Sequence, residues 1–263
     1  MIDTHCHLDR AAFDADRDAV LSRARAAGVT DVVVPAVEPS GWDGLLALCD
    51  RERGLHPALG IHPQALPDLD PAADDRHLAD LEALLLRRAA VAVGECGLDG
   101  GTVADGVSLD RQRAVLRGHL AIARRLGLPV VIHALRAHDA IREELERDGL
   151  PAGGVLHSFS GSAEQVAPLA ALGLHFSFAG PVTYEGARKP IAAVRAVPRE
   201  RLLVETDAPD QTPRPLHRTR NEPANLPLVL QAVAAALQTT VEEADRVTAA
   251  NARRLFRLAQ GPA

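Results

Sequence analysis

Residues 129–133 read PVVIH, a run of strand-forming apolar residues that ends at a histidine. Other side chains of metal-ligand type take similar positions: Glu95 after VAVG, His157 after GGVL, Asp207 after LLVET, and the pair His5 and His7 near the apolar start of the chain. Continuous Val, Ile and Leu runs are typical of parallel strands that are covered on both faces. Ligand-type residues at the ends of so many runs predict a metal site on the rim of a barrel.

Eight strand-like runs alternate with segments of helical spacing. The runs begin at Ile2, Asp31, His56, Val91, Pro129, Gly153, Leu174 and Leu202. Helical spacing is clearest at residues 16–27, 109–126 and 163–172, each of which is followed by glycine near the expected helix end. This alternation predicts parallel βαβ units. Eight units in 263 residues favour a single (β/α)8 TIM-type barrel, with an extra C-terminal helix at residues 241–258.

Composition narrows the function classes. We expect one domain over residues 1–263, and no Gly-x-Gly-x-x-Gly turn follows the first strand to indicate dinucleotide binding. The net charge of −6 argues against a broad basic surface for nucleic acid, although local phosphate contact stays possible. Three cysteines without C-x-x-C spacing favour reduced thiols and a cytoplasmic location. We see no leader-like start and no apolar run of ~20 residues, so we expect neither secretion nor a membrane span.

The ligand-type residues can be divided between two ions. His5 and His7 are two residues apart, so on a strand they point to the same side and can bind one ion, with Asp207 completing its shell. His133 and His157 end adjacent strands and can bind a second ion. Glu95 can bridge the two with one carboxylate oxygen each. Mixed imidazole and carboxylate ligands suit divalent transition metals; two cations are expected, and Zn, Mg and Mn all stay open.

The motifs carry a family resemblance. IDTHCHLD from Ile2, GIHP from Gly60, GECGLD from Gly94, GVLHSFSG from Gly154 and ETDAP from Glu205 occur in the order of the TatD family of metal-dependent hydrolases. The segment VIHALRAHD resembles the YjjV-like branch of that family. The resemblance implies a TIM-like barrel, two divalent cations, DNase activity and the ligand set His5, His7, Glu95, His133, His157 and Asp207. Related amidohydrolases often bridge their metals with a carboxylated lysine, but the only lysine here is Lys189, after the seventh strand.

The mechanistic hypothesis is hydrolysis of a phosphodiester by a hydroxide that bridges the two metals. Asp207 and Glu95 are the candidate catalytic residues, with Asp207 as proton acceptor. His62 and Arg136 are candidate substrate contacts, and Glu205 is a candidate to orient a ligand. The loop after the eighth strand adds a basic patch that could guide DNA, formed by Arg214, His217, Arg218 and Arg220.

Two other functions stay open. The same site could hydrolyse an amide or ester, as in a deacylase, because fold alone does not set function. A metal-stabilised binding protein without turnover is the third possibility; no obligate protein partner is indicated. The glycine-rich GGTVADG from Gly100 replaces an aromatic segment that is common in the family, so the substrate pocket is expected to differ from that of the nuclease members.

Overall fold

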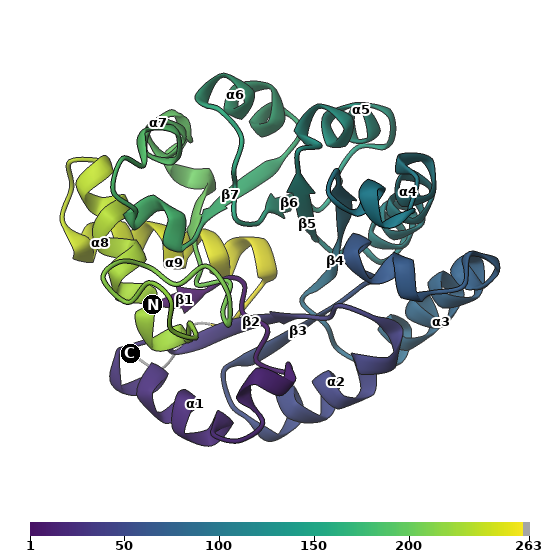
Figure 1. Ribbon diagram of the computed structural model, residues 1–263, viewed down its shortest axis with the longest axis horizontal. Coiled ribbons are helices and arrows are strands. Elements are labelled where there is room, and N and C mark those ends of the chain that lie inside the picture. Colours follow the sequence, from purple (N-terminus) through teal and green to yellow (C-terminus); the bar gives the residue numbers. More distant parts are fainter. Residues whose placement is uncertain (260–263) are drawn as a thin grey trace.

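Eight parallel strands form the centre of the molecule, and helices surround them (Figure 1). The computed structural model describes residues 1–259. The strands are β1 Ile2–Asp3, β2 Asp31–Pro35, β3 Leu55–Leu59, β4 Ala92–Asp99, β5 Val130–Leu135, β6 Gly154–Leu156, β7 Leu174–Phe178 and β8 Leu202–Val204. They lie side by side in chain order. Beyond the assigned strands, Thr4 N donates to Val204 O (3.2 Å) and Asp207 N to His5 O (2.9 Å), which joins the last strand segment to the first.

The predicted TIM-type barrel is therefore confirmed. The α-helices are α1 Arg17–Ala26, α2 Trp42–Arg51, α3 Asp74–Arg87, α4 Leu109–Leu126, α5 His138–Asp148, α6 Ala163–Ala171, α7 Arg188–Ala196, α8 Leu226–Ala236 and α9 Val241–Phe256. Short 3-10 helices are η1 Ala11–Phe13, η2 Pro39–Gly41, η3 Pro63–Asp68, η4 Pro71–Ala73, η5 Thr102–Asp105, η6 Gly180–Thr183, η7 Arg199–Arg201 and η8 Pro223–Asn225. The predicted domain also includes residues 260–263, which lie outside the described residues.

Helix α4 shows how local sequence sets these bounds. Ser108 accepts a hydrogen bond from Arg111 N (3.2 Å) and caps the start of the helix. Gly127 takes a φ of +64° directly after the last residue, a left-handed conformation that favours glycine. The helix therefore ends where the sequence predicted.

The extra C-terminal helix closes one end of the barrel. An apolar layer inside the barrel is formed by Ile2, Val33, Ala58, Ala92, Val131, Val155 and Leu203, and Ala249, Ala252, Leu255 and Phe256 of α9 pack against it. Figure 1 shows α9 passing behind the strands. Asn251 Nδ2 donates to Arg199 O (2.7 Å) and Leu202 O (2.9 Å), which fixes the helix at the start of β8. The opposite end of the barrel, at the carboxyl ends of the strands, is not covered by α9 and can hold a functional site.

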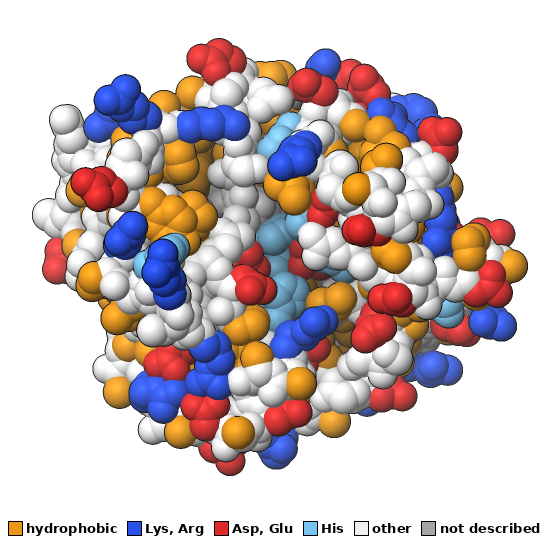
Figure 2. All heavy atoms as spheres, in the orientation of Figure 1, with side chains coloured by type: hydrophobic (Ala, Val, Ile, Leu, Met, Phe, Trp, Pro, Cys, Tyr) orange, Lys and Arg blue, Asp and Glu red, His pale blue; other side chains and the backbone are white. Residues whose placement is uncertain are grey.

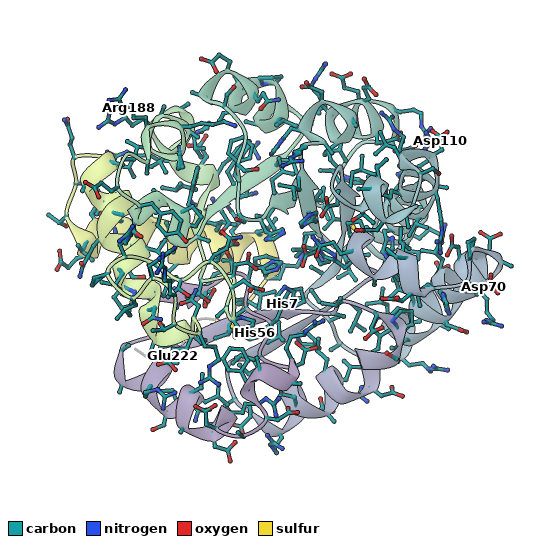
Figure 3. All side chains as sticks on the ribbon, viewed as in Figure 1. His7, His56, Asp70, Asp110, Arg188 and Glu222 are labelled. Atoms are coloured by element: carbon teal, nitrogen blue, oxygen red, sulfur yellow. The ribbon has the colours of Figure 1, made fainter. Side chains whose placement is uncertain are left out.

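Figure 3 places His7 near the middle of the ring, whereas Asp70, Asp110 and Arg188 lie around its outer helices.

Among residues 1–259 no single helix has the length and apolar composition to cross a membrane. One bent pair, Pro223–Ala236 with Val241–Phe256 at 106°, meets the criterion by length and composition only.

Truncating Phe256 tests the role of α9. Its side chain is 2% exposed, so Phe256→Ala leaves a cavity between helix and barrel and should lower the free energy of unfolding by about 3–5 kcal/mol. Leu86→Ala, at a side chain that is 69% exposed, should change it by less than about 0.5 kcal/mol. Urea unfolding followed by circular dichroism measures both. Equal effects would mean that α9 does not close the barrel.

A buried histidine links α4 to the loop after β3. His119 Nδ1 donates to Val115 O (2.8 Å), and its Nε2 accepts from Ile61 N (3.0 Å). Burial lowers the pKa of His119 to about 4, from an ordinary value of 6.5. The folded state therefore holds the neutral ring that both hydrogen bonds need.

This histidine should make stability depend on pH. Between about pH 6.5 and pH 4 the unfolded chain binds a proton at His119 that the folded chain does not, so its contribution is present above that window and is lost on acidification. The difference corresponds to about 3 kcal/mol. Urea unfolding in EDTA from pH 7 to pH 4 should show a smaller loss for His119→Gln than for the unsubstituted protein. Parallel curves would contradict this assignment.

Candidate metal centre

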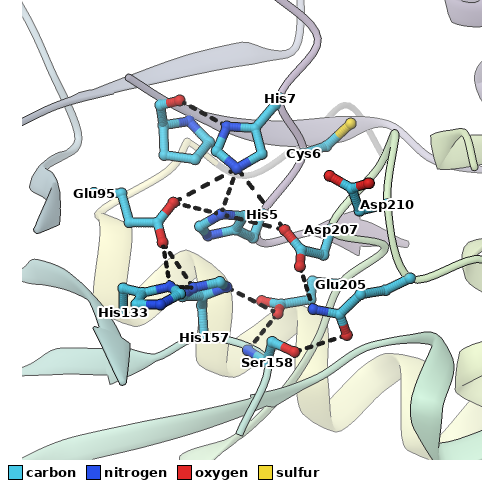
Figure 4. A network of polar contacts seen from close by, with 12 residues as sticks. His5, Cys6, His7, Glu95, His133, His157, Ser158, Glu205, Asp207 and Asp210 are labelled. Carbon is cyan, nitrogen blue, oxygen red and sulfur yellow. Dashed lines mark hydrogen bonds and ion pairs between the residues drawn. The ribbon is translucent and has the colours of Figure 1, made fainter. Parts of the chain in front are cut away.

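Most of the predicted ligands meet in one cavity at the carboxyl ends of the strands. The cavity has a volume of about 390 Å³, and its lining includes His7, His62, Glu95, His133, His157 and Asp207. His5, fully buried, lies beneath them. Figure 2 shows histidines at the floor of a hollow near the centre of this face, and Figure 4 shows the polar contacts among them.

Glu95 occupies an irregular position in β4. The register with β5 shifts between Val93 and Cys96, so the strand is not regular at the carboxylate. A Cβ on Gly94 would lie 2.5 Å from Val131 O, so the backbones of β4 and β5 approach each other closely at this glycine. The expectation that Glu95 ends the strand is wrong: pairing resumes after the shift, and β4 continues to Asp99. The expectation that His133 ends its strand is wrong as well, because β5 continues to Leu135.

One oxygen of Glu95 faces the first group of ligand candidates. Glu95 Oε2 lies 3.0 Å from His5 Nε2 and 3.5 Å from His7 Nε2. Asp207 Oδ1 lies 3.6 Å and 3.8 Å from the same two nitrogens. The two nitrogens are themselves 3.3 Å apart. Two imidazoles and two carboxylates thus converge on one volume, as the sequence predicted for the first ion.

The other oxygen of Glu95 faces a second group. Glu95 Oε1 lies 2.8 Å from His157 Nε2, 3.1 Å from His133 Nδ1 and 2.9 Å from His62 Nε2. His133 Nδ1 and His157 Nε2 are 3.1 Å apart. Glu95 therefore lies between two clusters of ring nitrogens, one on each oxygen.

Outer hydrogen bonds indicate which ring nitrogens carry a lone pair. His7 Nδ1 donates to Pro35 O (3.2 Å), and His133 Nε2 donates to Asp99 Oδ2 (3.1 Å). His157 Nδ1 faces Glu205 Oε1 at 3.6 Å. In the neutral rings of His7 and His133 the outer nitrogen then holds the proton, and the inner nitrogen is free to bind a cation.

His62 has the opposite arrangement. Its Nδ1 accepts a hydrogen bond from Gln64 N (3.0 Å), so in the neutral ring the proton is on Nε2. That Nε2 faces Glu95 Oε1 and can donate to it. Although His62, Glu95 and His133 are close enough to hold a metal, the tautomer favours His62 as a donor that holds the carboxylate.

The electrostatics of the centre suit cations. Burial raises the pKa of Glu95, but the surrounding imidazoles outweigh burial and hold it well below its usual value. Burial, reinforced by a neighbouring imidazole, lowers the pKa of His7 to about 3, so this ring is neutral. Glu95 Oε2 is buried and accepts no hydrogen bond from any residue in the described part of the chain. A charged oxygen without a donor, next to facing ring nitrogens, fits a divalent ion on that side.

Asp207 is held by a network that the sequence did not reveal. Gln211 Nε2 donates to Asp207 Oδ2, and Gln211 Oε1 accepts from Ser158 Oγ (2.8 Å). Below, the buried Asp3 accepts from Thr206 N (2.9 Å) and Thr206 Oγ1 (2.6 Å). Burial raises the pKa of Asp207 to about 6. The motif GLD contained one signal of such outer residues, Asp99, which reaches His133 because β4 continues to Asp99 beside β5.

Other predicted residues lie outside this cavity. Arg136 is exposed and lines a neighbouring cavity of about 320 Å³ with His138 and Gln165. In the expected basic patch, Arg220 instead forms an ion pair with Asp16 (2.7 Å) and lies over the ring of Phe13. Arg214, His217 and Arg218 stay exposed. The patch therefore has fewer free charges than the sequence suggested.

Known proteins are similar to this chain in sequence and in fold. The family model "TatD related DNase" matches residues 2–257. The chain belongs to the TatD family of metal-dependent hydrolases. It is 35% identical over 259 residues to the uncharacterized metal-dependent hydrolase YabD of Bacillus subtilis, covering 98% of this chain and 99% of that protein. It is 36% identical over 270 residues to the 3′-5′ ssDNA/RNA exonuclease TatD of Musicola paradisiaca, covering 99% of each.

A solved structure agrees over the whole chain. The crystal structure of YjjV, a TatD homologue from Escherichia coli, superposes with a TM-score of 0.92 at 36% identity and covers 98% of each chain. The family resemblance inferred from the ordered motifs is thus confirmed, and TatD-family relatives include proteins named as exonucleases and others named only as hydrolases.

Removing the charge of Glu95 should disrupt both proposed metal positions. In Glu95→Gln an amide replaces the bridging carboxylate, so we expect fewer than two bound ions. The affinity for metal should fall by at least ~10–100-fold, which is the loss typically caused by removing a residue that hydrogen-bonds to a metal ligand. Metal analysis after equilibration with Zn²⁺ or Mn²⁺ measures this directly. His217→Gln, at an exposed loop histidine, should retain the full metal content. Full occupancy in Glu95→Gln would contradict the bridging role.

Proposed function

We propose that this protein is a phosphodiesterase that shortens single-stranded DNA. The observation that carries the proposal is the position of Glu95 between two sets of ligand candidates, with the buried Asp207 beside one set. The exonuclease name of a full-length relative at 36% identity supports nucleic acid as the substrate. His5, His7, Glu95 and Asp207 would hold one divalent cation, and Glu95, His133 and His157 a second.

Bound cations at these positions would lower the pKa of water and neutralise charge on phosphoryl oxygens. Asp207 accepts the proton of the attacking water, because its buried carboxylate is held in place and its Oδ1 faces the ring nitrogens of the centre. Gln211 fixes the second oxygen of Asp207 and so sets the direction of the carboxylate. His62 donates to Glu95 and keeps its Oε1 in place. Together these residues hold one proton acceptor at a defined position.

A second candidate function, hydrolysis of an amide or ester, is favoured by one feature of the mouth. A cavity of about 460 Å³ adjoins His7 and is lined by the carboxylates of Glu38, Asp68 and Asp210 and by Arg10. Such a mainly acidic lining repels a phosphate chain and attracts an amine. An aminoacyl or peptide-like substrate would use this side of the mouth.

Asp207→Asn tests the proton acceptor; because Asp207 would also be a ligand of the first cation, metal content and circular dichroism are measured beside activity. Loss of the proton acceptor should lower kcat by about 10²–10⁴-fold, the usual contribution of a general base. The assay follows shortening of 3′-labelled single-stranded DNA by the metal-loaded protein, next to a panel of acyl esters and amides. Asp110→Asn, at an exposed residue of α4, is the matched control and should be fully active.

The outcomes divide the two candidates. DNA shortening that requires both added metal and Asp207 supports the phosphodiesterase. Intact DNA with Asp207-dependent cleavage of an acyl substrate supports the second candidate. Normal DNA turnover by Asp207→Asn would refute the role of this residue as proton acceptor.

A further inference from the structure

A smaller chamber opens beside the candidate metal centre. It has a volume of about 240 Å³ and lies between the ends of β6 and β7 and the start of α7. Ser158, Ser160 and Pro181 line both this chamber and the cavity of the metal centre. The two spaces are therefore adjacent, and one substrate can occupy both.

The chamber walls are mainly apolar and partly aromatic. Its lining includes Phe159, two residues after His157, and Phe178 at the end of β7, with ring centroids 6.2 Å apart. Pro181, Val182 and Pro190 complete the apolar surface. Figure 2 shows hydrophobic side chains lining a hollow beside the central histidines. The main cavity, by contrast, is lined by imidazoles and carboxylates.

The remaining lining is polar and positive. Lys189, the only lysine of the chain, is exposed in the first turn of α7 and lines the chamber. The hydroxyl-bearing Ser158 and Ser160 stand where the chamber meets the metal cavity. An occupant thus meets aromatic and apolar walls, polar groups at the entrance and one ammonium group.

We propose that this chamber binds the base of one of the two nucleotides that flank the scissile phosphate, with Lys189 attracting an adjacent phosphate. The inference rests on the proposed phosphodiesterase function. A base has an apolar ring face for the walls and polar edges for the serine hydroxyls, and it is attached to an anion. A simple acyl chain would leave Lys189 without a partner. The volume is below the ~300–1,000 Å³ of pockets for whole ligands, so it suits a single group.

Blocking the chamber provides the test. Ser160 is exposed at its entrance, so Ser160→Trp can close the chamber without altering the core. Metal-loaded protein is assayed on three single-stranded DNA substrates: an unmodified one, one with an abasic 3′-terminal nucleotide and one with an abasic penultimate nucleotide. For the unsubstituted protein, one abasic substrate should show kcat/KM lower by about 10- to 100-fold, the range expected for loss of one stacked base.

For Ser160→Trp, kcat/KM on unmodified DNA should fall to the value that the unsubstituted protein shows on that abasic substrate. On the abasic substrate itself, kcat/KM should change little between the two proteins. Glu185→Trp, an exposed site in the loop after β7 that is outside the chamber lining, controls for adding a large ring. A general block of the metal cavity would slow all three substrates equally and would overturn the proposal.

Lys189→Gln supplies a second test with little risk to folding. It should raise KM for DNA several-fold with kcat nearly unchanged, and the effect should shrink at high salt because it is electrostatic. Arg188→Gln, the preceding residue and outside the chamber lining, is the matched control. Equal KM changes in the two variants would contradict a specific role for Lys189.

The failures can be told apart. If the unsubstituted protein cleaves DNA but tolerates both abasic positions, the chamber assignment is wrong and the proposed function stands. If it cleaves none of the DNA substrates, the phosphodiesterase proposal and the chamber assignment fall together.

Discussion

The arrangement of the site depends on one buried carboxylate held among facing imidazoles. Glu95 is fully buried, and each of its oxygens lies within 3.0 Å of at least one histidine nitrogen. Facing ring nitrogens repel one another unless a proton or cation lies between them, and a buried carboxylate is costly unless it is paired. Two divalent cations would satisfy the carboxylate and the nitrogens together. The barrel supplies this geometry because all its strands finish at one end.

The barrel interior is layered from bottom to mouth. Apolar side chains and α9 fill the end where the strands begin. Above them lies a buried polar level, in which Thr4 contacts Ser177 (2.9 Å) and Asp3 binds Thr206. This level fixes the backbone just before His5 and Asp207, so ligand candidates from the first and last strands meet. Stability and site geometry therefore depend on the same closure of β1 against β8.

Much of the fold could be predicted because each strand has its own sequence signal. Apolar runs such as residues 129–133 predicted the strands. Helical spacing followed by glycine, as in α4, predicted the helices, and together these signals gave the eightfold alternation. The candidate ligands could be found because they lie at or near strand ends, where a parallel barrel brings them together. Residues that orient them could not be found this way. Gln211 and the tautomer-setting partner of His62 lie in connections between strands and helices, whose conformations no periodic pattern records, and Asp99 reaches His133 because β4 continues beyond its irregularity.

The most direct test of the bridging claim is anomalous X-ray diffraction from crystals equilibrated with Zn²⁺ or Mn²⁺. We expect two anomalous peaks on opposite sides of the Glu95 carboxylate. One should lie within bonding distance of His5, His7 and Asp207, and the other of His133 and His157. His62 should stay outside both shells, with its Nδ1 still facing Gln64 N. A single peak, or a peak that Glu95 does not contact, would show that Glu95 does not bridge two ions.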